Sequence, residues 1–256
     1  MPFLVVKKRT IIFVAIIILC SILLAIPFNG ACAAEVFFNQ KTKLCPVYSV
    51  DTDKKQVAIS FDAAWGADKT QDIMNICKEY GVNATFFLVG FWADKYTDLV
   101  KKISDEGFEI GTHSNTHPDF ATLSKTQMEQ ELVSSIDKIK TITNKNVELF
   151  RMPYGSYNDT AINLCSELNL IPIQWDVDSL DWKGLSAQEI CNRILNGVKS
   201  GSIILCHNNA DNIVAALPLV LDRLQKQGYT ITSVGELIYK ENYTIDRNGI
   251  QHQNIS

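Results

Sequence analysis

Residues 57–66 read VAISFDAAWG, an apolar run that gives way to an aspartate. The apolar part, Val57–Phe61, is too short for a helix and predicts a buried strand. Asp62 stands directly at the end of that strand. In parallel α/β folds, the loops that leave the carboxyl ends of the strands build the active site. The stretch therefore predicts both a strand of the sheet and a functional side chain at its end.

Six further apolar runs follow, and segments with helical spacing separate them. They cover residues 84–88, 108–112, 148–151, 171–176, 202–206 and 229–232. Seven strands separated by helices favour a parallel α/β sheet in a single domain, residues 55–240. Periodicity alone leaves an open doubly wound sheet and a closed barrel as alternatives. We expect residues 35–54 to form a lead-in and residues 241–256 a loose polar tail.

Several residues mark where the helices begin and end. Ser124 and Ser186 are each followed three residues later by Gln or Glu, which predicts a capping box at both places. Gly201 and Gly228 stand where glycines commonly end helices. Pro218 suits the first turn of a helix, so we expect the helix before Gly228 to begin there.

The first 34 residues have the features of a targeting segment. A basic cluster at 7–9 precedes an uncharged apolar run, residues 11–28, and an A-x-A-like site follows at 31–33. This pattern predicts a secretory signal peptide, but the run is also just long enough to span a bilayer as an uncleaved anchor. Either alternative places the rest of the chain outside the cytoplasm.

The composition excludes several classes of protein. With 46% hydrophobic and 20% charged residues, the chain is neither disordered nor a multi-span membrane protein. Beyond residue 34 it carries 21 basic against 28 acidic residues, so we expect no binding to nucleic acid. The five cysteines in this part have irregular spacings. They predict mostly buried thiols, with one pair as an alternative, rather than a disulfide framework or a zinc knuckle.

Polar motifs follow the other predicted strands as well. They are His113 and His117 after the third, Arg151–Gly155 after the fourth, Asp178–Trp182 after the fifth and His207 after the sixth. Each has an ordinary structural explanation, because aspartates cap helices, polar loops contain histidines by chance and tryptophans are usually buried in the core. Their occurrence at successive strand ends of one domain indicates a single active site instead.

In these motifs the chain resembles the polysaccharide deacetylases of carbohydrate esterase family four, the NodB-like domains. The resemblance covers roughly residues 54–240. It implies a distorted (β/α)7 barrel, preceded here by the N-terminal hydrophobic segment. The first motif of the family, usually Thr-Phe-Asp-Asp-Gly, reads Ser-Phe-Asp-Ala-Ala-Trp-Gly at residues 60–66. This variant, behind a single hydrophobic segment, is similar to the branch linked to sporulation.

The resemblance assigns chemical roles to four residues. Hydrolysis of an acetamide needs an activated water, stabilisation of a tetrahedral oxyanion and a proton for the leaving amine. Asp62 is the candidate base, and Arg151 would keep it ionised. His207 is the candidate acid, and Asp181 would orient its ring and raise its pKa.

The resemblance also implies contacts to the substrate. The backbone N–H near Tyr154 is a candidate oxyanion donor, and Trp182 with Leu205 would receive the acetyl methyl group. Aromatic residues after the strands indicate a surface that binds sugar rings. They are Trp65, Trp92 and Trp175.

One departure from the family pattern concerns the metal. His113 and His117 are the candidate ligands of a divalent cation, zinc in this family. The aspartate that completes the ligand set in the family is Ala63 here. Three alternatives follow: the metal is bound weakly, another carboxylate such as Asp68 replaces the missing ligand, or catalysis is feeble or lost. Asp62 also has the reach to ligate the metal, but the base would then be missing.

These features predict an extracytoplasmic hydrolase that removes N-acetyl groups from cell-wall or related polysaccharide, and the resemblance to the sporulation-linked branch implies a part in sporulation. The alternative is a non-catalytic relative that binds glycan, because a methyl group replaces the metal ligand. O-deacetylation or attack on a non-sugar amide is a third alternative. The expected partners are the polysaccharide and, if the N-terminal segment is uncleaved, the membrane.

Overall fold

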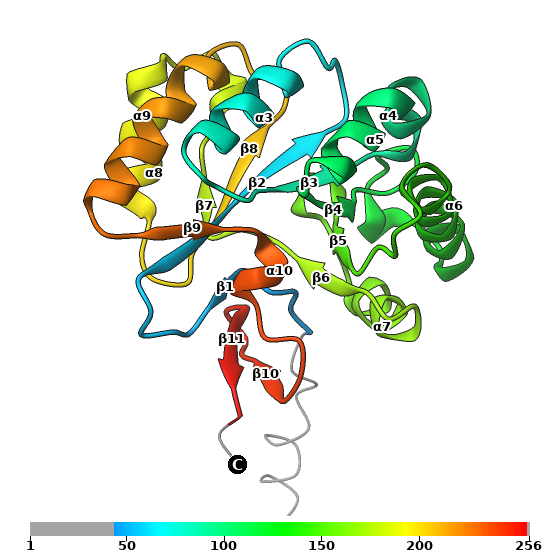
Figure 1. The fold of residues 1–256 in the computed structure, drawn as a ribbon. Coiled ribbons are helices and arrows are strands. Elements are labelled where there is room, and N and C mark those ends of the chain that lie inside the picture. Colours follow the sequence, from blue (N-terminus) through cyan, green and yellow to red (C-terminus); the bar gives the residue numbers. More distant parts are fainter. Residues whose placement is uncertain (1–43, 255–256) are drawn as a thin grey trace, which may run out of the picture. The chain divides into compact units, whose positions relative to one another are not determined.

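The structure, a computed structural model, describes residues 44–254 (Figure 1). The strands are β1 (Ser49–Val50), β2 (Gln56–Ala63), β3 (Thr85–Leu88), β4 (Glu109–Thr112), β5 (Leu149–Arg151), β6 (Ile171–Ile173), β7 (Val177–Asp178), β8 (Ile203–His207), β9 (Thr230–Thr232), β10 (Tyr243–Ile245) and β11 (Ile250–Gln253). The α-helices are α3 (Thr70–Glu79), α4 (Gly90–Lys95), α5 (Thr97–Asp105), α6 (Lys125–Thr143), α7 (Asp159–Glu167), α8 (Ala187–Gly197), α9 (Ile213–Lys226) and α10 (Val234–Leu237). Three short 3-10 turns are η1 (Phe120–Thr122), η2 (Pro153–Gly155) and η3 (Asp181–Lys183).

The main sheet is parallel and curls into an incomplete barrel. Its order is β6-β5-β4-β3-β2-β8-β7, and β9 also pairs with β2. The edge strands β6 and β7 follow each other in the chain, so residues 174–176 join the two edges of the sheet. The helices cover the outside of this curled sheet (Figure 1). This confirms the α/β fold class and the distorted (β/α)7 barrel that the resemblance implies.

Strand β2 lies in the middle of the sheet and is buried on both faces. Val57, Ile59 and Phe61 belong to the largest apolar cluster, which also holds residues of α3, α8 and α9. The alternate residues face the other way, as the two-residue period of a strand requires. At the carboxyl end of β2, Asp62 pairs in register with His207 of β8. The hydrophobic pattern of β2 therefore places the candidate base beside the candidate acid.

All seven predicted strands are present, and the predicted run 171–176 differs in one respect. It contains β6 but ends after three residues, and the separate strand β7 begins at Val177. The capping boxes at Ser124 and Ser186 are confirmed at the starts of α6 and α8. The cysteine prediction is also confirmed, because Cys77, Cys165, Cys191 and Cys206 are buried free thiols.

The predicted helix start at Pro218 is wrong. Helix α9 begins at Ile213, and Pro218 lies inside it. An internal proline costs about 3 kcal/mol because one backbone hydrogen bond is lost and its ring crowds the preceding turn. Ile213, Ala216 and Leu217 are fully buried, and their burial offsets that cost.

The expectation of a loose tail after residue 241 is also wrong. Strands β10 and β11 form an antiparallel hairpin, and β11 pairs in parallel with β1. The turn of this hairpin is closed by Asp246, whose Oδ1 accepts hydrogen bonds from the N–H groups of Asn248 and Ile250. Asn248-Gly249 is a common turn dipeptide, so the sequence did contain a signal for this hairpin.

Within residues 44–254, no helix is both long enough and apolar enough to cross a membrane. The predicted signal peptide or anchor at 1–34 and the first part of the lead-in lie outside the described residues. Both therefore remain predictions.

Candidate active site

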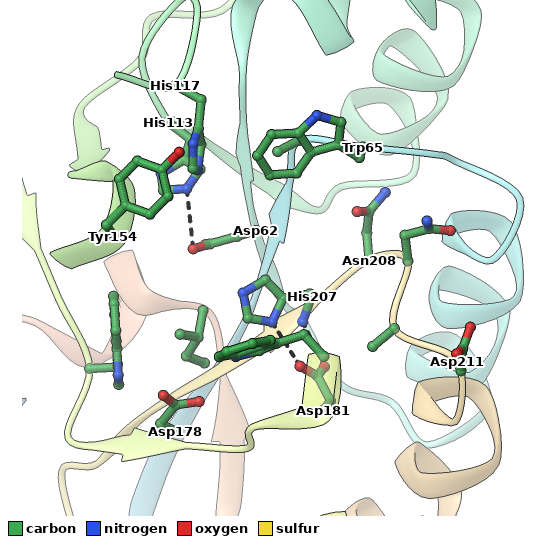
Figure 2. Close-up of a pocket in the computed structure, with 16 residues that line it drawn as sticks. Asp62, Trp65, His113, His117, Tyr154, Asp178, Asp181, His207, Asn208 and Asp211 are labelled. Carbon is green, nitrogen blue, oxygen red and sulfur yellow. Dashed lines mark hydrogen bonds and ion pairs between the residues drawn. The ribbon is translucent and has the colours of Figure 1, made fainter. Parts of the chain in front are cut away.

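A pocket of about 610 Å³ opens at the carboxyl ends of the strands of the main sheet (Figure 2). It is lined by Asp62, Ala64, Trp65, His113, His117, Tyr154, Trp175, Asp178, Asp181, Trp182, Leu205, His207, Asn208, Asn209, Ala210 and Asp211. The lining includes all the candidate catalytic, substrate-binding and histidine ligand residues except Arg151, which is fully buried and pairs with Asp62. The strand-end argument thus brings these residues into one pocket.

Asp62 is held by a buried ion pair. The Nη1 of Arg151 donates a hydrogen bond of 2.8 Å to Asp62 Oδ1, and its Nη2 donates to the carbonyl of Gln174. The guanidinium also stacks on the Phe87 ring, 4.1 Å from its centroid. Burial alone raises the pKa of Asp62, but the charge of Arg151 and the nearby imidazoles outweigh it and hold the pKa below its ordinary value. The carboxylate is therefore ionised and fixed in orientation, as a general base must be.

His207 is held by a second carboxylate. Its Nδ1 lies 2.7 Å from Asp181 Oδ1, and its backbone N–H donates to the other carboxylate oxygen at 2.8 Å. Because ionised Asp181 can only accept, Nδ1 carries a proton. Burial alone lowers the pKa of His207, but the hydrogen bond and charge of Asp181 raise it above its ordinary value. The protonated form is favoured, which suits a general acid.

His113 and His117 occupy the opposite side of the pocket (Figure 2). The Nδ1 of His113 lies 2.7 Å from the carbonyl oxygen of Arg151 and must donate to it, so Nε2 faces Asp62 Oδ2 at 3.4 Å. His117 lies edge-on to the rings of His113, Trp65 and Tyr154. Burial, reinforced by His113, lowers the pKa of His117 to about 4. Both rings lack a carboxylate partner of the kind that Asp181 gives His207.

A carboxylate from α6 fixes the loop that carries these two histidines. Glu131 Oε2 accepts hydrogen bonds from the backbone N–H groups of Asn115 at 2.9 Å and Thr116 at 2.7 Å. Its Oε1 accepts from the Thr116 hydroxyl at 2.7 Å. His117 has a positive φ of 62°, a strained conformation for a non-glycine residue. Sequence reasoning missed Glu131, because nothing in a helical pattern shows what its polar face contacts.

The residues present do not fit a catalytic zinc site with three protein ligands. Within residues 44–254, no group of three His, Cys, Asp or Glu side chains is placed to hold one ion. Ala63, at the position of the family's ligand aspartate, is fully buried in the main apolar cluster. Asp68 does not replace it, because its side chain is 74% exposed beside Lys69 and does not line the pocket.

Three exposed aromatic side chains surround the pocket. Trp65 is 60% exposed, Trp182 61% and Tyr154 68%, whereas Leu205, which also lines the pocket, is buried. Trp175 also lines the pocket. Large exposed aromatic faces are suited to stacking on sugar rings.

The expectation that Trp92 binds sugar is wrong. Trp92 is 1% exposed, and its indole N–H donates a 2.6 Å hydrogen bond to the carbonyl of Gly66. This hydrogen bond anchors the turn that carries Trp65. The large ring of Trp92 is packed in the core, so it has no face free to bind a sugar.

Sequence reasoning also missed the loop after β8. The Asn208 amide donates to the Gly66 carbonyl at 3.1 Å and to the Thr70 hydroxyl at 3.0 Å, which joins this loop to the one after β2. Asn209 and Asp211 continue the lining of the pocket. The only available signal was the polar run that follows His207.

The chain thus combines a curled parallel barrel with a pocket that holds an arginine-paired carboxylate and a carboxylate-bound histidine, and comparison with known proteins assigns this fold to a family. A sequence model described as polysaccharide deacetylase matches residues 49–173. A peptidoglycan-N-acetylglucosamine deacetylase of Bacillus cereus is 31% identical over 195 residues, which span 75% of this chain and 71% of that protein. The chain belongs to the polysaccharide deacetylase family.

Other relatives show how varied the matching proteins are. The uncharacterized protein YlxY of Bacillus subtilis is 30% identical over 75% of this chain, but the match spans only 60% of that relative. The crystal structure of a CE4 family pseudoenzyme from Bacillus anthracis matches with a TM-score of 0.74 and 32% identity, over 76% of this chain and 69% of that one. A mutant of this pseudoenzyme is described as having restored enzymatic activity.

Proposed function

We propose that this chain is an extracytoplasmic deacetylase that hydrolyses N-acetyl groups of cell-wall or related glycan. One observation carries the proposal. Asp62, held by Arg151, and His207, held by Asp181, sit in register on adjacent strands and line one pocket. A fixed base beside a fixed acid is the arrangement that amide hydrolysis requires.

The reaction begins with Asp62, which removes a proton from a water molecule as the water attacks the acetyl carbonyl. The oxyanion of the tetrahedral intermediate is stabilised by the backbone N–H near Tyr154. His207 then donates its proton to the nitrogen of the sugar, so that the carbon–nitrogen bond breaks to give acetate and a free amine. Trp182 and Leu205 enclose the methyl group. No step is assigned to a metal, since the described residues do not supply the ligand set.

A second candidate function is glycan binding without catalysis. Ala63 favours it, because a buried methyl group stands where the family has a ligand. The similarity to a pseudoenzyme of the same fold also favours it. In this case the exposed faces of Trp65, Tyr154 and Trp182 bind the sugar, and the acid–base residues turn over no substrate.

The cellular setting of the proposal rests on residues outside the described range. The basic cluster and apolar run of residues 1–34 support an exported protein, either secreted or anchored to the membrane. The motif variant at residues 60–66 supports a role in sporulation. Localisation of a fluorescent fusion and its time of expression would test both points.

The decisive experiment measures acetate release by the purified chain from chitin oligomers and from peptidoglycan fragments, together with its metal content. Release by the native chain and its loss in Asp62→Asn would support the enzyme. Asp137→Asn is a matched control, because Asp137 is an exposed residue of α6 that does not line the pocket. Retention of glycan without acetate release would favour the binding protein.

A further inference from the structure

Two loops beside the pocket are joined by the buried side chain of Asn208. One is the loop between β2 and α3, which carries Trp65 and Gly66, and the other follows β8. The amide Nδ2 of Asn208 donates hydrogen bonds to the Gly66 carbonyl at 3.1 Å and to the Thr70 hydroxyl at 3.0 Å. Its backbone N–H donates to the Asp62 carbonyl at 3.1 Å. Asn208 therefore holds the loop after β2 at its start, at its middle and at its end.

The turn at Gly66 is fixed from a second direction as well. The indole N–H of Trp92 donates to the same Gly66 carbonyl at 2.6 Å. Gly66 has a positive φ of 65°, and the Asn209 side chain lies only 2.5 Å from the place where a Cβ would stand. This turn thus needs a glycine, and packing supports the two hydrogen bonds that hold its backbone.

The Trp65 ring has much weaker support than the turn that carries it. It is 60% exposed, and its centroid lies 4.9 Å from that of His117 and 6.4 Å from that of Phe91. The backbone of the turn therefore has a large part in setting where this ring points. An exposed ring binds a sugar better when it is already held in place, because ordering a mobile side chain on binding has an entropic cost.

We propose that Asn208 is a positioning residue for glycan binding, which holds the exposed ring of Trp65 in place through the Gly66 carbonyl. Asn208 and Trp65 both line the pocket (Figure 2). All three N–H donors of Asn208 are used within the protein, so its effect on a sugar passes through the turn. This inference rests on the proposed function and adds a residue that regulates how the same site binds its glycan.

The test is a double-mutant cycle, measured by calorimetric titration of the full chain with the tetrasaccharide of N-acetylglucosamine. Every variant also carries Asp62→Asn, which prevents turnover during the titration. Trp65→Ala should weaken binding about tenfold, because one stacked aromatic face is lost. Asn208→Ala should weaken it about threefold, since Trp92 still holds the Gly66 carbonyl. The double variant should bind no more weakly than Trp65→Ala alone, because no ring is then left to position.

Two further variants separate positioning from stability. Gln251→Ala removes a comparably buried amide, which donates to the Tyr239 carbonyl at 2.8 Å and lies outside the pocket lining. It should lower the midpoint of thermal unfolding and leave glycan affinity unchanged. Asn208→Asp keeps the shape of the side chain but loses the donor to Gly66, so it should bind glycan at least as weakly as Asn208→Ala. Hydrogen exchange at Trp65 and Gly66 should accelerate in both Asn208 variants and not in Gln251→Ala.

Several results would overturn the proposal. If the losses in the double variant multiply, Asn208 acts independently of Trp65. Unchanged affinity in Trp65→Ala, Asn208→Ala or Asn208→Asp would also overturn it, as would an equal loss in Gln251→Ala or no glycan binding by the Asp62→Asn chain.

Acetate release by the native chain, measured separately, keeps the two proposals distinguishable. Release together with multiplying losses would overturn the positioning role and leave the deacetylase intact. A non-additive cycle without acetate release would uphold the positioning role and favour the glycan-binding function.

Discussion

The two sides of the pocket both hold histidines, but their pKa values shift in opposite directions. On one side, Asp181 accepts two hydrogen bonds from His207 and raises its pKa. On the other side, His113 and His117 have only a carboxylate that Arg151 already holds, and the pKa of His117 falls to about 4. A carboxylate partner of its own therefore decides whether the pKa of a buried histidine is raised or lowered. The His207–Asp181 side has both groups that a general acid needs, whereas the His113–His117 side lacks a third ligand for a metal.

The largest effect on activity is expected when the His207–Asp181 side is disrupted. His207→Ala removes the proton donor and should lower the turnover number for acetate release by about 10²–10⁴-fold, with little change in glycan affinity. His252→Ala is the control. His252 is a partly exposed residue of β11 that pairs with Asp51 and does not line the pocket. Unchanged turnover in His207→Ala would exclude it as the acid.

Completing the other side should have the next largest effect. Ala63→Asp places a carboxylate in a fully buried, apolar position, so the metal-free variant should lose about 2–4 kcal/mol of stability. If the side chain reaches the histidines, zinc should bind tightly and restore the thermal midpoint. His113→Ala in this background should abolish the response to zinc, and Ala63→Asn should show none. If zinc leaves the midpoint of thermal unfolding of Ala63→Asp unchanged, the two histidines do not form a metal site and are ordinary loop residues.

The comparison can be sharpened at Asp181. Asp181→Asn keeps the shape but removes the charge that raises the pKa of His207, so the alkaline limb of the activity profile should move to lower pH. The pair stabilises the native state fully below about pH 6.5, the unfolded pKa of histidine, and this contribution is lost as pH rises through the higher folded value. The variant should therefore lose about 1.5–3 kcal/mol near pH 6 and less near pH 9. Equal losses at both pH values would contradict the assigned pair.

The smallest effect should follow at Glu131. Glu131→Ala removes the acceptor for two backbone N–H groups and should cost about 1–2 kcal/mol, whereas Glu131→Gln retains one acceptor oxygen and should cost less. Hydrogen exchange should accelerate at Asn115 and Thr116 and stay unchanged at His207. Faster exchange on both sides of the pocket would show that the two sides are not independent.

The sequence predicted the site better than the edges of the fold. Asp62 and His207 directly follow apolar runs of strand length, so their position at strand ends could be inferred from local pattern alone. Strand β7 has two residues, too few for any period to appear. The helical position of Pro218 and the buried position of Trp92 depend on which partners they pack against, and local pattern carries no such information. Glu131 and the loop after β8 were missed for the same reason.

The pairing of β1 with β11 has a consequence for the order in which the fold is assembled. Ser49 and Ile250 are partners in the small three-stranded sheet, and every element of the barrel lies between them in the chain. Closing a loop of this length is slow and has a high entropic cost, so the pairing is expected to form after the more local strand pairs. A chain that ends before residue 250 should still acquire the barrel, but it would leave the edge of β1 open and ready to pair with a second copy.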